Sequence, residues 1–187
     1  SWSTWNMASL FGSVASSTAR AASKMNLSNN VVLFMQETRG TAGDLASLPD
    51  THLHFGVLNP DEEVGSSRAG GIVTSIHKDI IHISEKSFAT GRCHGVLTKG
   101  PSLEAFCINI HVNPQWTYLQ KKFVLVAISK YIKLHGTAIL FLGGDWNFIH
   151  SDDRRFDTAS ATETASNDPI AQVFESVLCD LVELAQP

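Results

Sequence analysis

The chain has 187 residues, of which 43% are hydrophobic and 17% are charged, so we expect a folded domain and not a disordered chain. Its formal net charge of −4 excludes a protein that holds nucleic acid through a broad surplus of positive charge. No apolar run approaches the roughly 20 residues of a transmembrane helix. We therefore expect one domain over residues 1–187 with no membrane span, and nothing in the sequence indicates an obligate oligomer.

The three cysteines, Cys93, Cys107 and Cys179, are far apart and form no CxxC pair. An odd number at wide spacing argues against a disulfide framework or a zinc site and is typical of a reducing compartment. The opening residues also lack the basic start and apolar stretch of a signal peptide. Together these features predict an intracellular protein, nuclear or cytoplasmic, whose thiols are ordinary semi-buried groups.

The first part of the chain alternates between strand and helix signals. We predict a strand at 2–6, a helix at 10–24, a buried strand at 31–36 and a short helix near 42–47. Five strand-like segments follow, separated by turn residues whose spacing is typical of antiparallel hairpins. They are 51–58, 70–77, 80–84, 91–98 and 103–112.

The second part of the chain carries longer helical patterns. A helix is predicted over Gln115–Leu134, with Trp116, Leu119, Phe123 and Val126 as its apolar stripe. The run 137–144 predicts another buried strand. A last helix begins at Asp168-Pro169, an N-cap followed by proline at the first helical position, and a further element begins near 181. Helices alternating with buried strands favour an α/β domain. Trp2, Trp5 and Trp116 are expected in its core.

Polar side chains stand where the apolar strands end. Asn6, Glu37 and His111 each follow or end one strand, and Asp145 with Asn147 follows another. Charged and amide groups are costly to bury without partners, so each position needs a reason. A single case is usually a cap or a turn, but strand ends are also where α/β proteins place their sites. We expect these groups to converge.

The residue types suit hydrolysis of a phosphodiester bond. Glu37 is a hard oxygen ligand for Mg²⁺, with Mn²⁺ as the alternative. Asp145 could orient or deprotonate the attacking water, and Asn147 projects to the same side if the segment stays extended. His111 could donate a hydrogen bond to the charge that builds up in the transition state, and Asn6 could support Glu37 or Asp145.

Five segments in this order carry a resemblance to a known superfamily: TWNMASL, VVLFMQET, RAGGIVTSI, INIHVNP and GGDWNF. The chain resembles the endonuclease/exonuclease/phosphatase superfamily over nearly its whole length. The resemblance implies a four-layer α/β sandwich, two mixed β-sheets flanked by helices. It matches Asn6 and Glu37 to the family's first-strand Asn and metal-binding Glu, His111 to its Tyr or His, and Asp145 with Asn147 to its DxN pair.

The chain departs from the family pattern at two points, which bear on the completeness of the domain and on its subfamily. A second Asp and a later Asp-His pair have no counterpart before Pro187, so we expect a domain that is incomplete at its C-terminus, with the last strands missing. HVNP also differs from the Tyr-x-Pro-Asn of apurinic endonucleases. The chain looks most like the endonuclease domains of non-LTR retrotransposons, which implies DNA as substrate. RNA, a lipid headgroup or an inositol phosphate remains an alternative substrate, and a degenerate binding module remains an alternative function.

Three arginines beside these motifs, Arg39, Arg154 and Arg155, are candidates for binding substrate phosphates, because guanidinium groups bind phosphate oxygens in pairs. For Arg154 and Arg155 the sequence favours a solvated loop paired with the preceding aspartates, and a loop that contacts phosphate is the alternative. His52 and His54 alternate on one strand face, but no further Cys or His stands at helpful spacing. We therefore expect them to be ordinary strand histidines.

Overall fold

A computed structural model describes residues 2–6, 31–38, 42–57, 71–136, 138–147, 154–157, 162–165, 169–170, 172–174 and 176. The chain divides into two compact units. The first comprises Ser1–His111 with Ala138–Asp145, and the second comprises Val112–Thr137 with Trp146–Pro187. The helix predicted at 10–24 and the element predicted near 181 lie outside the described residues.

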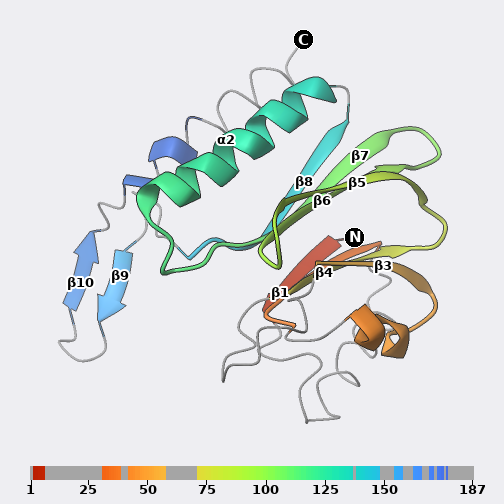
Figure 1. The fold of residues 1–187 in the computed structure, drawn as a ribbon, viewed down its shortest axis with the longest axis horizontal. Helices are drawn as coiled ribbons and strands as arrows, with labels where there is room; N and C mark the ends of the chain where they lie inside the picture. Colours follow the sequence, from red (N-terminus) through yellow and green to blue (C-terminus); the bar gives the residue numbers. More distant parts are fainter. Residues whose placement is uncertain are drawn as a thin grey trace. The chain divides into compact units, whose positions relative to one another are not determined.

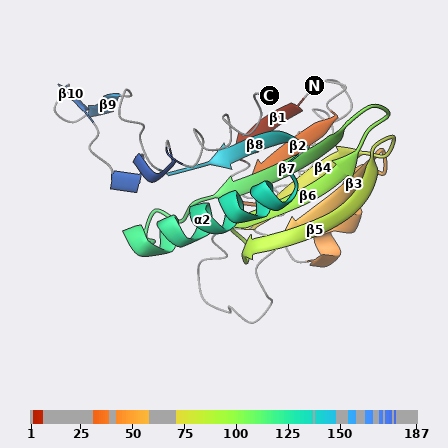
Figure 2. The same cartoon turned by 90° about the horizontal axis from the view of Figure 1, so that it is seen from above.

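The first unit contains two mixed four-stranded sheets (Figures 1 and 2). In the first sheet the order is β1-β2-β4-β3; β1 and β2 are parallel and the other pairs antiparallel. In the second the order is β5-β6-β7-β8, and only β7 and β8 are parallel. The strands are β1 (Trp2–Asn6), β2 (Val32–Gln36), β3 (His52–Val57), β4 (Ile72–His77), β5 (Ile81–Ala89), β6 (Cys93–Lys99), β7 (Glu104–His111) and β8 (Ile139–Asp145), with a 3-10 helix, η1, at Ala42–Ser47.

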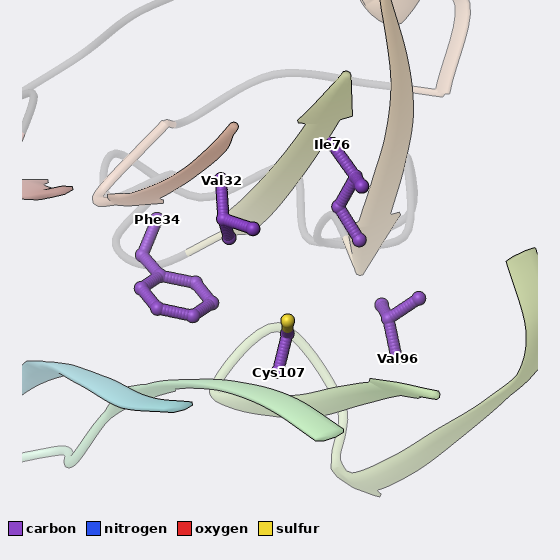
Figure 3. Packing of buried hydrophobic residues seen from close by; sticks show 5 residues of the cluster. All are labelled: Val32, Phe34, Ile76, Val96 and Cys107. Carbon is purple, nitrogen blue, oxygen red and sulfur yellow. The ribbon is translucent and has the colours of Figure 1, made fainter. Parts of the chain in front are cut away.

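The core of the first unit lies between these two sheets. Figure 3 shows Val32, Phe34 and Ile76 of the first sheet pointing toward Val96 and Cys107 of the second. All five side chains are buried, which is the main favourable term for holding two sheets face to face. The predicted α/β sandwich with two mixed sheets is therefore confirmed in its central layers.

The described cysteines, Cys93 and Cys107, are free, as the sequence predicted, and they are fully buried and not semi-buried. Burial raises the pKa of the Cys93 thiol, and it raises the pKa of Cys107 to about 12. Both groups therefore stay protonated and unreactive near neutral pH.

Trp2 was predicted in the core, and this is wrong. Its side chain is 50% exposed, although one side of its ring packs against Phe34 and Phe141 at centroid distances of 6.5 and 6.3 Å. Trp2 begins β1, which is an edge strand in the described sheet, so an aromatic residue there can be covered on one side only. The side chain of Trp5 lies outside the described part.

The glycine pair just before the last residue of β8 allows the backbone to approach its neighbours closely. A Cβ atom on Gly143 would lie 2.6 Å from Cδ2 of Phe34, so this glycine makes room for the facing sheet. Gly144 has a φ of 144°, and a Cβ there would lie 1.8 Å from the carbonyl oxygen of Ile110. Glycine is required at 144 both by its dihedral angle and by this contact.

We therefore expect Gly144→Ala to lower the free energy of unfolding by about 3 kcal/mol or more, because the cost of the strained backbone adds to the cost of overpacking by the new methyl group. Urea unfolding followed by circular dichroism measures the change. The control is Gly100→Ala, where the nearest atom to the new Cβ is 3.6 Å away. Equal stability of the two variants would contradict this account of the β8 glycines.

The second unit contains the long helix α2 (Tyr118–Leu134). The helix was predicted from Gln115, but Thr117 is its N-cap: the Thr117 hydroxyl accepts from the Gln120 backbone N–H, and the Gln120 side chain accepts from the Thr117 N–H. The predicted apolar stripe is also wrong, since Leu119 and Phe123 are 73% and 71% exposed. The buried residues are Val124, Leu125, Ile128, Ser129 and Ile132.

A short antiparallel hairpin, β9 (Arg154–Asp157) with β10 (Thr162–Ala165), also belongs to the second unit. The loop expected around Arg154 and Arg155 is therefore a strand in this region. Residues 169–170, 172–174 and 176 are helical, in agreement with the last predicted helix. Within the described residues, no helix has both the length and the apolar composition that a membrane span needs.

A buried histidine on β6 couples the stability of the first unit to pH. His94 is 3% exposed, and its Nε2 lies 3.1 Å from an oxygen of Glu85. Burial lowers the pKa of His94, and the carboxylate of Glu85 opposes this effect in part. The unfolded chain therefore takes up a proton near the ordinary value of 6.5, at a pH where the folded chain does not. The contribution of His94 to stability is present above that pH and is lost as the pH falls below it.

We expect His94→Gln to make the free energy of unfolding less dependent on pH below about 6.5, by at most about 1.4 kcal/mol per pH unit for one proton. Glutamine keeps a donor for Glu85 but does not titrate. Urea unfolding at a series of pH values, on His94→Gln and on the unmodified chain in parallel, measures the slope. A slope in His94→Gln as steep as in the unmodified chain would refute the role of His94.

Candidate active site

Three predicted site residues meet at one end of the two sheets. Glu37 follows β2, His111 ends β7 and Asp145 ends β8. One ligand atom from each, two carboxylate oxygens and one imidazole nitrogen, lies within 4.8 Å of the other two. The expected convergence of strand-end polar groups is therefore observed for these three.

Strand register explains why two of the three meet. In the parallel pair of β7 and β8, His111 is the partner of Asp145. Side chains of a strand alternate between its two faces, so Cys107 and His111 lie on the same face of β7. Because Cys107 lies in the core between the sheets, His111 is directed toward the first sheet, where Glu37 follows β2. His111 Nε2 is 3.6 Å from Glu37 Oε1.

The backbone at Glu37 is in an uncommon conformation. Glu37 has a φ of 52°, in the left-handed region that non-glycine residues rarely adopt. Its side chain is 27% exposed, so the carboxylate is partly open to solvent. Residues held in this way are concentrated at functional sites, where the surrounding structure keeps the conformation in place.

Main-chain hydrogen bonds connect the segments that carry the site. The N–H of Thr38, next to Glu37, donates to Gly71 O at 3.2 Å, and the N–H of Gly71 donates to Gly91 O at 3.0 Å. On the other sheet, His111 N–H donates to Arg92 O at 2.7 Å. The ends of β2 and β7 are thus joined through the turn between β5 and β6, which limits their relative movement.

His111 is held as a neutral imidazole. It is 3% exposed, and Arg92 Nη1 lies 3.1 Å from its Nδ1. Burial lowers the pKa of His111, and the positive charge of Arg92 lowers it further; the carboxylates of Glu37 and Asp145 act in the opposite direction. A neutral ring with one N–H is suited to donating a hydrogen bond without carrying a charge.

A buried amide network lies behind the three site residues. Asn109, fully buried on the same face of β7 as His111, donates to the carbonyl oxygens of Met35 and Val73 at 3.2 and 3.0 Å. Its Oδ1 accepts from Gln36 Nε2 at 2.8 Å, and Gln36 also bonds to Thr4. These bonds join the two sheets one residue before Glu37 and two residues before His111.

The other predicted site residues have different outcomes. Asn6 pairs with Gln36 in the parallel register of β1 and β2, which places its backbone beside the residue before Glu37; its side chain lies outside the described part. Arg39 is outside the described residues, and so are the side chains of Arg154 and Arg155. The phosphate-binding role of these arginines therefore stays a prediction.

Asn147 departs from the expected geometry. The prediction assumed an extended segment from Asp145 to Asn147, but Asn147 has a φ of 47°. The condition under which Asn147 would project to the same side as Asp145 is therefore not met, and the site role of Asn147 stays a prediction. Its Nδ2 donates to the carbonyl oxygen of Val112 at 2.7 Å, within the second unit. Trp146, between the two, packs its ring against Phe174 at a centroid distance of 4.6 Å.

Three residues that support the site were not predicted from the sequence: Gln36, Arg92 and Asn109. A signal existed for Asn109, because it interrupts an otherwise apolar strand on the face that carries His111. Gln36 was not singled out because the adjacent Glu37 already accounted for a polar group at the end of this strand. Arg92 stands in a turn, where a basic residue is ordinary. Only the pairing of Cys93 with Ile110 shows that Arg92 lies beside His111.

The donor set fits a divalent metal ion. Two carboxylates partly open to solvent and one buried imidazole offer ligand atoms that lie within 4.8 Å of one another. Mg²⁺ in proteins takes one or two carboxylates and keeps the rest of its shell for water and phosphate, which agrees with this small number of protein oxygens. Histidines on β3 do not make a second centre of this kind: both ring nitrogens of His54 are bonded, to Ser75 Oγ and Pro49 O.

Comparisons with solved structures show the same fold in two endonucleases and in TDP2. An AP endonuclease, LMAP from Leishmania major, is 15% identical, with a TM-score of 0.67; the match covers 95% of this chain and 65% of that one. The endonuclease domain of TRAS1, a telomere-specific non-LTR retrotransposon, is 12% identical, with a TM-score of 0.62 and coverages of 96% and 70%. TDP2 of D. rerio complexed with single strand DNA product is 18% identical, with a TM-score of 0.59 and coverages of 79% and 60%.

The match with the TDP2 structures spans about half to two thirds of their length, from 49% to 66%. No curated protein sequence matches the chain. The sequence pattern of the Endonuclease/Exonuclease/phosphatase family matches residues 3–178, which include Glu37, His111 and Asp145. This match and the shared fold lead to one conclusion: the chain belongs to the Endonuclease/Exonuclease/phosphatase family.

Proposed function

We propose that this chain hydrolyses phosphodiester bonds in DNA with a divalent metal ion, as an endonuclease domain of retroelement type. The observation that carries the proposal is the cluster of Glu37, His111 and Asp145, which joins the ends of β2, β7 and β8. Enzymes of this family are hydrolytic nucleases and phosphodiesterases that generally use divalent metals. A DNA substrate is supported by the single strand DNA product bound to D. rerio TDP2, and the retroelement type by the similarity to the TRAS1 domain.

In this proposal the three residues divide the chemistry. Glu37 holds the metal, and a divalent cation at that position supplies positive charge that polarises a phosphoryl oxygen. Asp145 accepts the proton of the attacking water and orients it. His111, neutral and buried, donates a hydrogen bond from Nε2 to the charge that develops on the phosphate. Asn6 and Asn147, as matched by the family motif, support the metal ligand and the phosphate.

Metal removal tests the proposal. We expect the protein to nick supercoiled plasmid DNA in Mg²⁺ or Mn²⁺, to lose this activity in EDTA, and to regain it when the metal is added back in excess. The reason is that hydrolysis needs positive charge at the phosphate. A divalent cation supplies this charge, and the carboxylates of the described cluster would hold the cation. Agarose gel electrophoresis follows the conversion of supercoiled to nicked plasmid.

The same preparation distinguishes the alternatives. Hydrolysis of RNA, sphingomyelin or an inositol polyphosphate without hydrolysis of DNA would support the proposed type of reaction and contradict the proposal that DNA is the substrate. DNA binding without turnover of any of these substrates, in either metal, would favour a non-catalytic binding module and contradict the proposed function. Nicking that persists in EDTA would contradict the metal dependence.

A further inference from the structure

The main chain alone places Arg92 opposite His111. It ends the turn between β5 and β6, where its N–H donates to Ala89 O at 3.0 Å, and Gly91 in this turn has a φ of 63°. The next residue, Cys93, pairs with Ile110, and the main-chain bond from His111 N–H to Arg92 O at 2.7 Å continues this ladder. Sheet register therefore fixes the position of Arg92 next to His111, and its side chain can reach the imidazole.

The side-chain contact determines which ring nitrogen of His111 carries the proton. A guanidinium group has five N–H donors, accepts no hydrogen bond and does not lose its charge in proteins. Because Arg92 Nη1 lies 3.1 Å from His111 Nδ1, Nδ1 must be the acceptor. The single N–H of the neutral ring is then on Nε2, the atom that lies 3.6 Å from Glu37 Oε1.

A protonated Nε2 has no lone pair for a metal ion. We propose that Arg92 sets the metal preference of the site: it holds His111 as the Nε2–H tautomer, removes the imidazole from the ligand set, and leaves the oxygens of Glu37 and Asp145. The inference rests on the proposed function of this cluster as a metal centre. Arg92 is a positioning residue, because it acts through His111.

The preference follows from ligand chemistry. With an available imidazole nitrogen, two carboxylates and a histidine within 4.8 Å form a mixed nitrogen and oxygen set, the kind that binds Zn²⁺ well. Without it the described cluster offers oxygens alone, which suit Mg²⁺ and Mn²⁺. Arg92 thus keeps a binding site that contains a histidine from becoming a zinc site.

The test compares the unmodified protein with Arg92→Met by calorimetric titration of Mg²⁺ and Zn²⁺, without substrate. Loss of the Arg92 charge strengthens the binding of both cations, so the readout is the ratio of their dissociation constants. We expect Arg92→Met to shift this ratio toward Zn²⁺ by about tenfold or more, the usual scale of changes around a metal ligand. The double variant Arg92→Met/His111→Gln should lose the shift, because it lacks the charge and the imidazole together.

A direct measurement on the unmodified protein does not depend on the variant. Histidine labelled with ¹⁵N distinguishes the two tautomers by NMR at about pH 8, where the ring is neutral, and His111 is assigned by the signals missing from His111→Gln. We expect the proton on Nε2 and none on Nδ1. A proton on Nδ1, or an unchanged ratio of metal affinities in folded Arg92→Met, would overturn the inference. Neither readout uses catalysis, so an inactive protein would contradict the proposed function alone.

Discussion

Replacing Asp145 with asparagine should lower the rate of plasmid nicking at saturating Mg²⁺ by about a thousandfold, within the range of 10² to 10⁴ that a positioned base contributes. Asparagine has nearly the shape of aspartate, and its amide oxygen can still accept a hydrogen bond from water. It cannot take the proton of the attacking water, and it brings no negative charge into the cluster with Glu37 and His111. Initial rates at several metal concentrations measure the effect.

Two comparisons make the Asp145 result specific. Glu37→Gln should raise the Mg²⁺ concentration needed for half-maximal activity, because Glu37 is the proposed ligand, whereas added metal should not rescue Asp145→Asn. Asp79→Asn is the matched control, since this aspartate is 89% exposed and its partner is His77, outside the cluster. Activity of Asp145→Asn within tenfold of the unmodified protein would show that Asp145 is not the base.

Replacing Asn109 with leucine should lower the free energy of unfolding by about 3 to 5 kcal/mol. Leucine fills a similar volume but leaves the carbonyl oxygens of Met35 and Val73 and the amide of Gln36 without the partner that Asn109 provides. Each buried polar group that loses its hydrogen bond costs about 1 to 3 kcal/mol. Urea unfolding measures the loss, and the control is Asn113→Ala, whose side chain bonds to Gln115 N–H in an exposed turn.

A double-variant cycle isolates the bond between the two amides. Because Gln36 and Asn109 are in direct contact, the loss in Asn109→Leu/Gln36→Leu should be smaller than the sum of the two single losses. The same variants should weaken Mg²⁺ binding, since these residues stand just before Glu37 and His111. Additive losses with unchanged metal binding would show that the network has no part in positioning the site.

Local patterns in the sequence identified most of the strands of the first unit. The apolar run at 31–36 became β2, and the turn-separated segments became β3 to β7 with the expected antiparallel pairs. These predictions succeeded because alternation and turn residues act over a few neighbouring positions. The sequence did not show that β4 and β5, which follow each other in the chain, belong to different sheets.

Helix α2 shows where local patterns fail. Leu119 and Phe123 stand four residues apart and form an apolar pair, yet they are exposed, whereas Val124, Leu125 and Ile128 are buried. The helix has apolar residues on more than one side, and periodicity measures which residues share a side. It does not measure which side meets a partner, because that depends on residues distant in the chain.

The sequence by itself determined the strand-end positions of Glu37, His111 and Asp145, the ordered motifs that resemble the family, and the buried thiols. Each depends on residue type and near neighbours. The tertiary structure alone decided that these three groups meet within 4.8 Å, that Asn109 joins the sheets, and that Arg92 bonds to the ring of His111. Arg92 and His111 are 19 residues apart in the chain, and only strand register and the packing of two sheets bring such groups together.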